Sequence, residues 1–362
     1  MLKNIKIDQL PIFGFTMSHI LNNDFLSLSR SNEWYLEPFT IDNSDYKIEV
    51  WDTGVIYIAP KLNHQFDKSF VFSSAVHGNE TAPIEICNEL ITSILTNQLK
   101  PKYPVLFIFG NPASINIDKR FVEENMNRLF SGYHSKGADA QGRTSNKERQ
   151  RAKFLEQSVS RFFNLHATSD KTHYDLHTAI RDSAHEKFAV YPYLHGKPWS
   201  KQQFEILKAM GVTTFLLMQK PATTFSYYSS NTHQAHAFTI ELGKVRPFGQ
   251  NEQSKFAAAK QTLIDLLVGR EFVGEKFNAD NYQLMSVFRE INKHHWDFSL
   301  CFSDELANFT SFKKGDTLAI ESGEPIIVEQ DGEAIVFPNA NVEIGQRALL
   351  TVIPTDINHN LN

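Results

Sequence analysis

The stretch KSFVFSSAVHGNETAPIEICNELITSILTN (68–97) sets the expected fold, because it passes from a buried strand into a helix. Its first part, 68–78, is an apolar run that ends in a polar loop, which is typical of a buried strand. In 81–97 the apolar residues recur near helical spacing, so we expect a helix there. The polar cluster HGNE (77–80) therefore lies at a strand–helix junction.

The same alternation continues to about residue 269. A hairpin with Thr53-Gly54 near its turn is expected first, in YKIEVWDTGVIYIAP (46–60). This pattern indicates an α/β fold, with a mostly parallel or mixed central sheet flanked by helices. After residue 269 the sequence pattern changes to short strands and turns. We therefore expect an α/β domain over 1–269 and a small β-rich domain over 270–362. The further expected strands are 104–112, 173–179, 187–193, 213–219 and 236–243, and the further helices are 146–165, 200–211 and 253–269.

Composition and charge argue against several classes of partner and site. The formal net charge of −5 argues against a nucleic-acid partner, although an acidic protein can still have a locally positive pocket for a small anion. Cys87 and Cys301 form no Cys-x-x-Cys pair, so neither a disulfide framework nor a thiolate zinc site is expected. Residues 1–21 lack the features of a signal peptide, and no run approaches the roughly 18 apolar residues of a membrane span. We expect a cytoplasmic protein without a membrane partner, and its oligomeric state stays open.

Three polar clusters lie at the ends of predicted strands, namely HGNE (77–80), DLHT (175–178) and IELG (240–243). Ligands of open α/β sheets bind at the carboxyl ends of the strands, so these clusters are expected to share one crevice. His77 and Glu80 are three positions apart on a tight turn, and both can reach one ion. Catalytic zinc takes three protein ligands and keeps one open position, and His177 is our candidate for the third.

Each of these residues also fits an ordinary structural role. His77 and Glu80 fit a turn histidine and an acid favoured by the helix dipole, and His177 fits a buried histidine with satisfied hydrogen bonds. Asp175 fits either a residue that orients a ligand histidine or a simple strand-end acid. His173 has the same strand parity as His177, so parity alone leaves it open as the third ligand. The histidines that compete with His177 are His166, His173 and His185.

Glu241 is the candidate general base. A carboxylate in a dry crevice beside zinc can take a proton from the attacking water and pass it to the leaving nitrogen; the alternative is an edge-strand acid in water. The segment GNPASINIDKRFVEENMNRLF (110–130) adds Arg120, Asn127 and Arg128. A guanidinium binds carboxylates as a bidentate fork, so one arginine could hold a substrate carboxylate and another could stabilise an oxyanion. The alternative is two surface arginines in a charged loop.

Taken together, these motifs resemble the succinylglutamate desuccinylase and aspartoacylase family, within the wider group of zinc-carboxypeptidase-like hydrolases. They occur in the family's order over roughly residues 68–245, and a weaker similarity follows in GEAIVFPN (332–339). The matching motifs are HGNE (77–80), GNP (110–112), the spacing from Arg120 to Asn127-Arg128, DLHT (175–178) and IELG (240–243).

The resemblance implies one Zn²⁺ per chain, bound by His77, Glu80 and His177. It also implies that Glu241 is the catalytic glutamate and that Arg120 polarises the scissile carbonyl. A small N-acyl amino acid is the implied substrate.

The resemblance further implies that Asn127 and Arg128 hold a substrate carboxylate. Within the family, the desuccinylase branch hydrolyses N-succinyl-L-glutamate to succinate and L-glutamate, the last step of arginine breakdown by the succinyltransferase route. This branch is favoured by the NMNR wording (125–128), by the chain length and by the C-terminal VFPN segment (336–339). No counterpart of the aspartoacylases' substrate-binding tyrosine is identified, and Phe337 stands in that segment instead, which disfavours the aspartoacylase alternative; the partner of a second carboxylate stays unassigned. The alternatives are an aspartoacylase-like deacylase of another N-acyl amino acid and a non-catalytic zinc- or carboxylate-binding module.

Overall fold

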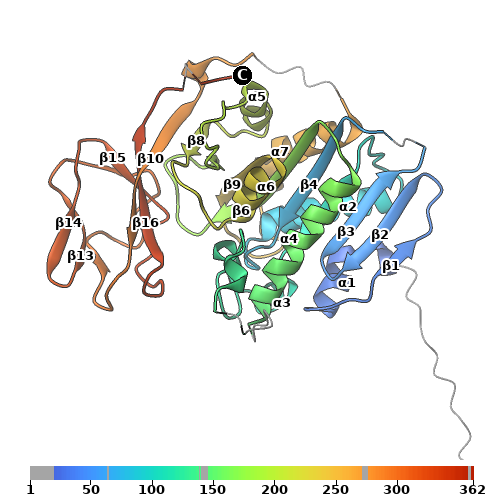
Figure 1. Cartoon of the computed structure of the whole chain (residues 1–362), viewed down its shortest axis with the longest axis horizontal. Coiled ribbons are helices and arrows are strands. Elements are labelled where there is room, and N and C mark those ends of the chain that lie inside the picture. Colours follow the sequence, from blue (N-terminus) through green and yellow to red (C-terminus); the bar gives the residue numbers. More distant parts are fainter. Residues whose placement is uncertain (1–19, 63–64, 138, 140–145, 271–275, 358–359) are drawn as a thin grey trace, which may run out of the picture.

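The chain folds around one long mixed β-sheet, seen in a computed structural model that describes residues 20–62, 65–137, 139, 146–270, 276–357 and 360–362 (Figure 1). The expectation of a chain without a targeting segment concerns residues 1–21, of which 1–19 lie outside the described residues. None of the described helices is long and apolar enough to cross a membrane. The helices are α1 (Phe25–Ser31), α2 (Thr81–Leu95), α3 (Pro112–Asn116), α4 (Lys147–Leu165), α5 (Lys201–Ala209), α6 (Phe225–His233) and α7 (Gln253–Val268).

The strands fall into two groups along the chain. The strands of the first group are β1 (Phe39–Ile41), β2 (Tyr46–Asp52), β3 (Val55–Pro60), β4 (Lys68–Ser74), β5 (Val105–Phe109), β6 (Asp170–Ala179), β7 (Phe188–Tyr191), β8 (Thr214–Leu217) and β9 (His236–Lys244). Those of the second are β10 (Gln283–Asn292), β11 (Ser299–Leu300), β12 (Ser311–Phe312), β13 (Thr317–Glu321), β14 (Glu324–Ile327), β15 (Glu333–Val336) and β16 (Arg347–Pro354).

Strand order brings the predicted site together. The main sheet runs β1-β2-β3-β5-β4-β6-β9-β7-β8-β10-β16-β15-β12. Its centre, β5-β4-β6-β9, is parallel, whereas β2 and β3 form an antiparallel hairpin and β7 runs antiparallel to β9. The predicted α/β fold with a mixed sheet is confirmed. Because β4, β6 and β9 are parallel neighbours, their carboxyl ends lie at one edge of the sheet.

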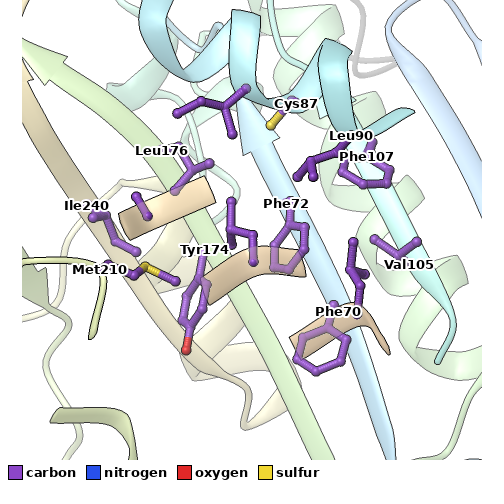
Figure 2. Packing of buried hydrophobic residues seen from close by; sticks show 14 of the residues in the cluster. Phe70, Phe72, Cys87, Leu90, Val105, Phe107, Tyr174, Leu176, Met210 and Ile240 are labelled. Carbon is purple, nitrogen blue, oxygen red and sulfur yellow. The ribbon is translucent and has the colours of Figure 1, made fainter. Parts of the chain in front are cut away.

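Helices cover both faces of the central sheet, which explains its almost uninterrupted apolar strand sequences. On one face α2 packs against β4, β5 and β6, with Cys87 and Leu90 above the aromatic rings of the strands (Figure 2). On the other face lie α4 and α6. The labelled strand residues of the first face are Phe70, Phe72, Val105, Phe107, Tyr174, Leu176 and Ile240.

Two local features show how sequence fixes structure. The hairpin turn contains Gly54 with φ +65°, and an added Cβ would lie 2.3 Å from the carbonyl oxygen of Phe109. Only glycine fits this backbone conformation and this close approach. Helix α6 was not expected. Its N-cap is Thr224, whose Oγ1 accepts a hydrogen bond from the N–H of Tyr227 (3.3 Å).

The C-terminal β-rich segment continues the main sheet. Strand β10 pairs in parallel with β8 and antiparallel with β16, while β11, β13 and β14 form a separate small sheet. The segment has its own apolar cluster around Leu318 and Leu349. Arg181, just after β6, donates to the carbonyl of Pro338 (3.1 Å) and to Asp304 (3.0 Å), which ties the segment to the α/β part. The domain division at 269/270 stays a prediction.

Candidate metal centre and active site

The three predicted polar clusters meet at the carboxyl edge of β4, β6 and β9. His77 and Glu80 lie on the turn between β4 and α2, and His177 lies on β6. Glu241 lies on β9 directly opposite His177 in the parallel register. Gly78 allows the turn to pack closely, because a Cβ there would lie 2.2 Å from the backbone carbon of Ser114 in α3.

His77, Glu80 and His177 form a buried group that can bind a metal ion. Their ligand atoms all lie within 4.8 Å of one another, and the residues are only 1%, 2% and 1% exposed. Each carboxylate oxygen of Glu80 faces one histidine: Oε1 is 2.8 Å from Nδ1 of His77, and Oε2 is 2.8 Å from Nδ1 of His177. Two imidazoles and one carboxylate are a known ligand set for zinc.

The other ring nitrogens are held by acceptors. Nε2 of His77 lies 2.9 Å from Oδ1 of Asn125, and Nε2 of His177 lies 2.8 Å from Oδ2 of Asp175. Both Nε2 atoms therefore carry the proton, and a neutral ring has only a lone pair left at Nδ1. In neutral His77 that lone pair faces a carboxylate oxygen, an arrangement that a cation between them satisfies. The donor set thus fits a metal ion, with Asp175 and Asn125 orienting its histidines.

In the metal-free group the two histidines differ in charge. Burial, together with the charge of Arg120, lowers the pKa of His77 to about 4, so the ring is neutral at neutral pH. Burial also lowers the pKa of His177, but the carboxylates of Asp175 and Glu80 outweigh it and raise the pKa well above its usual value. Burial would raise the pKa of Glu80, yet the two histidines hold it well below the usual range.

Glu241 has the properties of a proton carrier. Burial raises the pKa of Glu241 from 4.5 to about 7, and the nearby carboxylate of Glu80 contributes to the increase. Its Oε2 is buried and has no hydrogen-bond partner among the described residues. A carboxylate that is poised near neutral pH and lines the cavity can accept a proton and release it again.

The loop between α3 and α4 carries the predicted arginines and is fixed by Glu148. This fully buried carboxylate accepts the N–H groups of Val122 (2.7 Å), Glu123 (2.7 Å) and Glu124 (2.6 Å), and the side-chain amide of Asn111 (2.6 Å). Glu148 was not predicted as a site residue, because an acid in the first turn of a helix is an ordinary feature.

The predicted residues of this loop have different hydrogen-bond partners. Arg120 donates from Nη1 to Oε1 of Glu80 (2.7 Å) and keeps 30% of its side chain exposed. Oδ1 of Asn127 accepts the N–H of Phe225 (3.1 Å), which fixes the start of α6, and Nη1 of Arg128 donates to the carbonyl of Asn127 (2.9 Å). The role of Asn125 as partner of His77 was not predicted, although the sequence places it in this loop.

The competing histidines have other partners. His173 is fully buried on the same face of β6 as His177, but its ring lies between Ser73 (2.8 Å) and Ser229 (2.6 Å). It is absent from the metal-ligand group found among the described residues. His166 contacts the hydroxyl of Tyr57 (2.9 Å), and the ring of His185 packs against Phe309.

A cavity of about 370 Å³ connects these groups. Its lining includes His77 of the candidate metal site, Glu241 and the three predicted loop residues Arg120, Asn127 and Arg128. The C-terminal segment supplies another part of the wall. Its contributions include Asn308, Phe337, Gln346 and Arg347.

A mixed sheet with a buried His–Glu–His group and a buried glutamate at its carboxyl edge makes this an α/β protein with a candidate metal centre. The family described as "Succinylglutamate desuccinylase/Aspartoacylase catalytic domain" matches residues 67–267. The family described as "AstE/AspA barrel-sandwich hybrid domain" matches residues 280–355. The chain belongs to the succinylglutamate desuccinylase/aspartoacylase family, which is a family of enzymes.

Relatives and solved structures agree with this assignment. The succinylglutamate desuccinylase of Idiomarina loihiensis is 49% identical over 341 residues, covering 92% of this chain and 97% of that protein. The crystal structure of succinylglutamate desuccinylase from Chromobacterium violaceum is 34% identical with a TM-score of 0.80, covering 93% of this chain and 99% of that one. The X-ray structure of the enzyme from Vibrio parahaemolyticus is 32% identical with a TM-score of 0.80, covering 92% and 95%.

Proposed function

We propose that this protein hydrolyses the amide bond of N-succinyl-L-glutamate to succinate and L-glutamate in a zinc-dependent reaction. The observation that carries the proposal is the convergence of His77, Glu80 and His177 with Glu241 at one end of a cavity that also contains arginines. Relatives that are 49% identical over most of the chain are named succinylglutamate desuccinylase, which supports the substrate. By the same resemblance, we propose that the reaction is the last step of arginine breakdown by the succinyltransferase route. A cytoplasmic location is a separate proposal, made from the sequence.

A metal ion at this centre would supply Lewis-acid activation. A zinc ion held by His77, Glu80 and His177 would polarise the attacking water and the scissile carbonyl. Asp175 and Asn125 hold the two imidazole rings through their Nε2–H groups, which keeps Nδ1 of each ring directed at Glu80.

Glu241 is the proposed general base and acid. Its carboxylate takes a proton from the water whose oxygen bonds to the acyl carbon, and then gives this proton to the leaving nitrogen as the C–N bond breaks. The pKa of about 7, raised by burial, suits both transfers at neutral pH. The products are succinate and L-glutamate, so water supplies every atom that is added.

The two loop arginines are proposed to act on different parts of the substrate. Arg120 is anchored on Glu80 by Nη1, and its partly exposed guanidinium can donate to the carbonyl oxygen as it becomes negative. Arg128 is proposed to bind a substrate carboxylate beside Asn127. Phe337 lines the cavity and has no hydroxyl group, which favours the desuccinylase over the aspartoacylase-like alternative.

A substrate panel tests the proposal. Purified protein would be assayed at equal concentrations of N-succinylglutamate, N-succinylarginine, N-acetylaspartate and N-acetylglutamate. Each assay would be run after chelation, with and without zinc restored. We expect zinc to restore activity and N-succinylglutamate to give the highest kcat/KM. Much faster cleavage of N-acetylaspartate would overturn the desuccinylase proposal but not the amidohydrolase proposal, and full activity in the chelated sample would overturn the zinc requirement.

A further inference from the structure

An arginine from the C-terminal segment reaches the same cavity as the loop arginines. Arg347 is the first residue of β16, and it lines the cavity together with Arg120 and Arg128. Its side chain is 13% exposed. Among the described residues its one ion-pair partner is Glu290, with 4.0 Å between Nη1 and Oε1, at the outer limit for such a contact. Glu290 is itself 38% exposed, so this pair is weak.

The positive charge of Arg128 is compensated by nearby carboxylates even less than that of Arg347. Nη1 of Arg128 donates to a backbone carbonyl, and no carboxylate of the described residues forms an ion pair with it. Burial lowers the pKa of Arg128 well below its usual value, the charges of Arg347 and Arg120 lower it further, and Glu290 alone opposes them. Two largely buried guanidinium groups that share one half-exposed carboxylate are costly unless an anion joins them. Around Arg128 and Arg347 the described residues therefore leave positive charge that a polycarboxylate ligand would balance.

Strand order places Arg347 away from the metal site. Glu241 lies on β9, and strands β7, β8 and β10 separate β9 from β16, which Arg347 begins. Arg120, in contrast, donates to Glu80 at the metal site. Arg347 therefore reaches the cavity from a part of the sheet that is away from the metal site.

We propose that Arg347 binds the side-chain carboxylate of the glutamate moiety, so that residues of the C-terminal segment help to determine substrate specificity. This inference rests on the proposed function. In N-succinyl-L-glutamate that carboxylate lies further from the scissile bond than the other two, which matches the position of Arg347. A planar guanidinium can bind it in bidentate fashion, and the bound anion would compensate the charges of both Arg347 and Arg128.

The test uses the zinc-loaded protein and four substrates. They are N-succinyl-L-glutamate and three analogues in which one carboxylate is replaced by an amide: that of the glutamate side chain, that of the α-carbon, or that of the succinyl group. Arg347→Gln should raise KM for N-succinyl-L-glutamate about ten- to hundred-fold, the effect expected for a lost charged hydrogen-bond pair, with a smaller change in kcat. For the side-chain amide, N-succinyl-L-glutamine, the same substitution should change KM less than about threefold, because the contact is already absent.

Two further variants separate substrate binding from structure. Arg347→Lys keeps the charge but loses the fork, so it should give part of the KM increase and the same dependence on substrate. Glu290→Gln removes the protein partner of Arg347 and should not raise KM. Equal losses on all four substrates, or a Glu290→Gln variant that reproduces the losses of Arg347→Gln, would overturn the inference. If the KM increase caused by Arg347→Gln disappears instead with the amide of the α-carboxylate or of the succinyl carboxylate, the assignment to the side-chain carboxylate is wrong. If the wild-type protein does not cleave N-succinyl-L-glutamate, the proposed function itself fails.

Discussion

Replacing Glu241 with Gln should make the metal-free protein more stable at alkaline pH while removing most of its activity. Burial raises the pKa of Glu241 from 4.5 to about 7, so between these values the native state holds a proton that the unfolded chain has lost. Stability therefore falls as pH rises through this window, and the penalty is complete above pH 7. At 1.36 kcal/mol per pKa unit it amounts to about 3 kcal/mol. Gln is neutral at every pH and lacks this penalty.

Urea unfolding in the presence of a chelator would measure the effect at pH 5 and at pH 8. The free energy of unfolding of Glu241→Gln relative to wild type should increase by roughly 2 to 3 kcal/mol between the two pH values. With zinc bound the increase should shrink, because a nearby cation favours the carboxylate. A Glu→Gln change at the exposed Glu324 serves as the control and should show no such increase.

The catalytic half of the prediction uses the zinc-loaded variant. Turnover should fall by roughly two to four orders of magnitude, the usual contribution of a positioned acid–base group, while the zinc content stays near that of wild type. A stability difference that does not change between pH 5 and pH 8 would refute the argument that Glu241 is a buried charge. Equal losses of zinc and activity would instead make Glu241 a residue of the metal centre.

Three further predictions concern the proposed metal ligand His177 and the loop between α3 and α4. His177→Ala should lose bound zinc and activity together, because two protein ligands hold zinc poorly; full zinc content by metal analysis with normal turnover would make His173 the next candidate. Glu148→Gln leaves one oxygen for four donors, so it should lower the free energy of unfolding by about 2 to 6 kcal/mol in urea titrations; an unchanged value would show that the loop is held by other contacts. Arg128→Lys should mainly raise KM and Arg120→Ala should mainly lower kcat, and steady-state kinetics that show one common effect would contradict the proposed division of roles.

Much of the fold could be predicted, because hydrophobic periodicity reports burial. The strands β4, β5, β6 and β9 were expected within a few residues of their bounds, and the hairpin of β2 and β3 was found from its turn. Strand direction was not predictable, because a buried strand such as β7 has the same apolar pattern whether it is parallel or antiparallel. Helix α6 (FSYYSSNTH) was missed because serine, tyrosine and asparagine have modest helix propensity, and packing against β6 and β9 stabilises it instead.

The site residues that lie at the ends of strands could be predicted from the sequence. His77, His177 and Glu241 were singled out because each follows an apolar strand, and parallel neighbours end at one edge. The structure brings them together as expected, while their catalytic and metal-binding roles stay predictions. Asn125 could not be separated in advance from Asn127, because both are asparagines of one loop. Their roles depend on the backbone, which directs one amide to His77 and the other to α6.

Arg347 shows what sequence patterns omit. It begins a strand of a β-rich segment, with no motif around it, and it lies far from Arg128 in the chain. Its place in the cavity depends on the pairing of β10 with β8 and of β16 with β10, since these two contacts bring the C-terminal segment to the edge of the central sheet. What singles out Arg347 is the charge balance of the assembled cavity. Arg120 donates to Glu80, whereas Arg128 and Arg347 share among the described residues only the distant Glu290, so we infer that the balancing anion comes with the ligand.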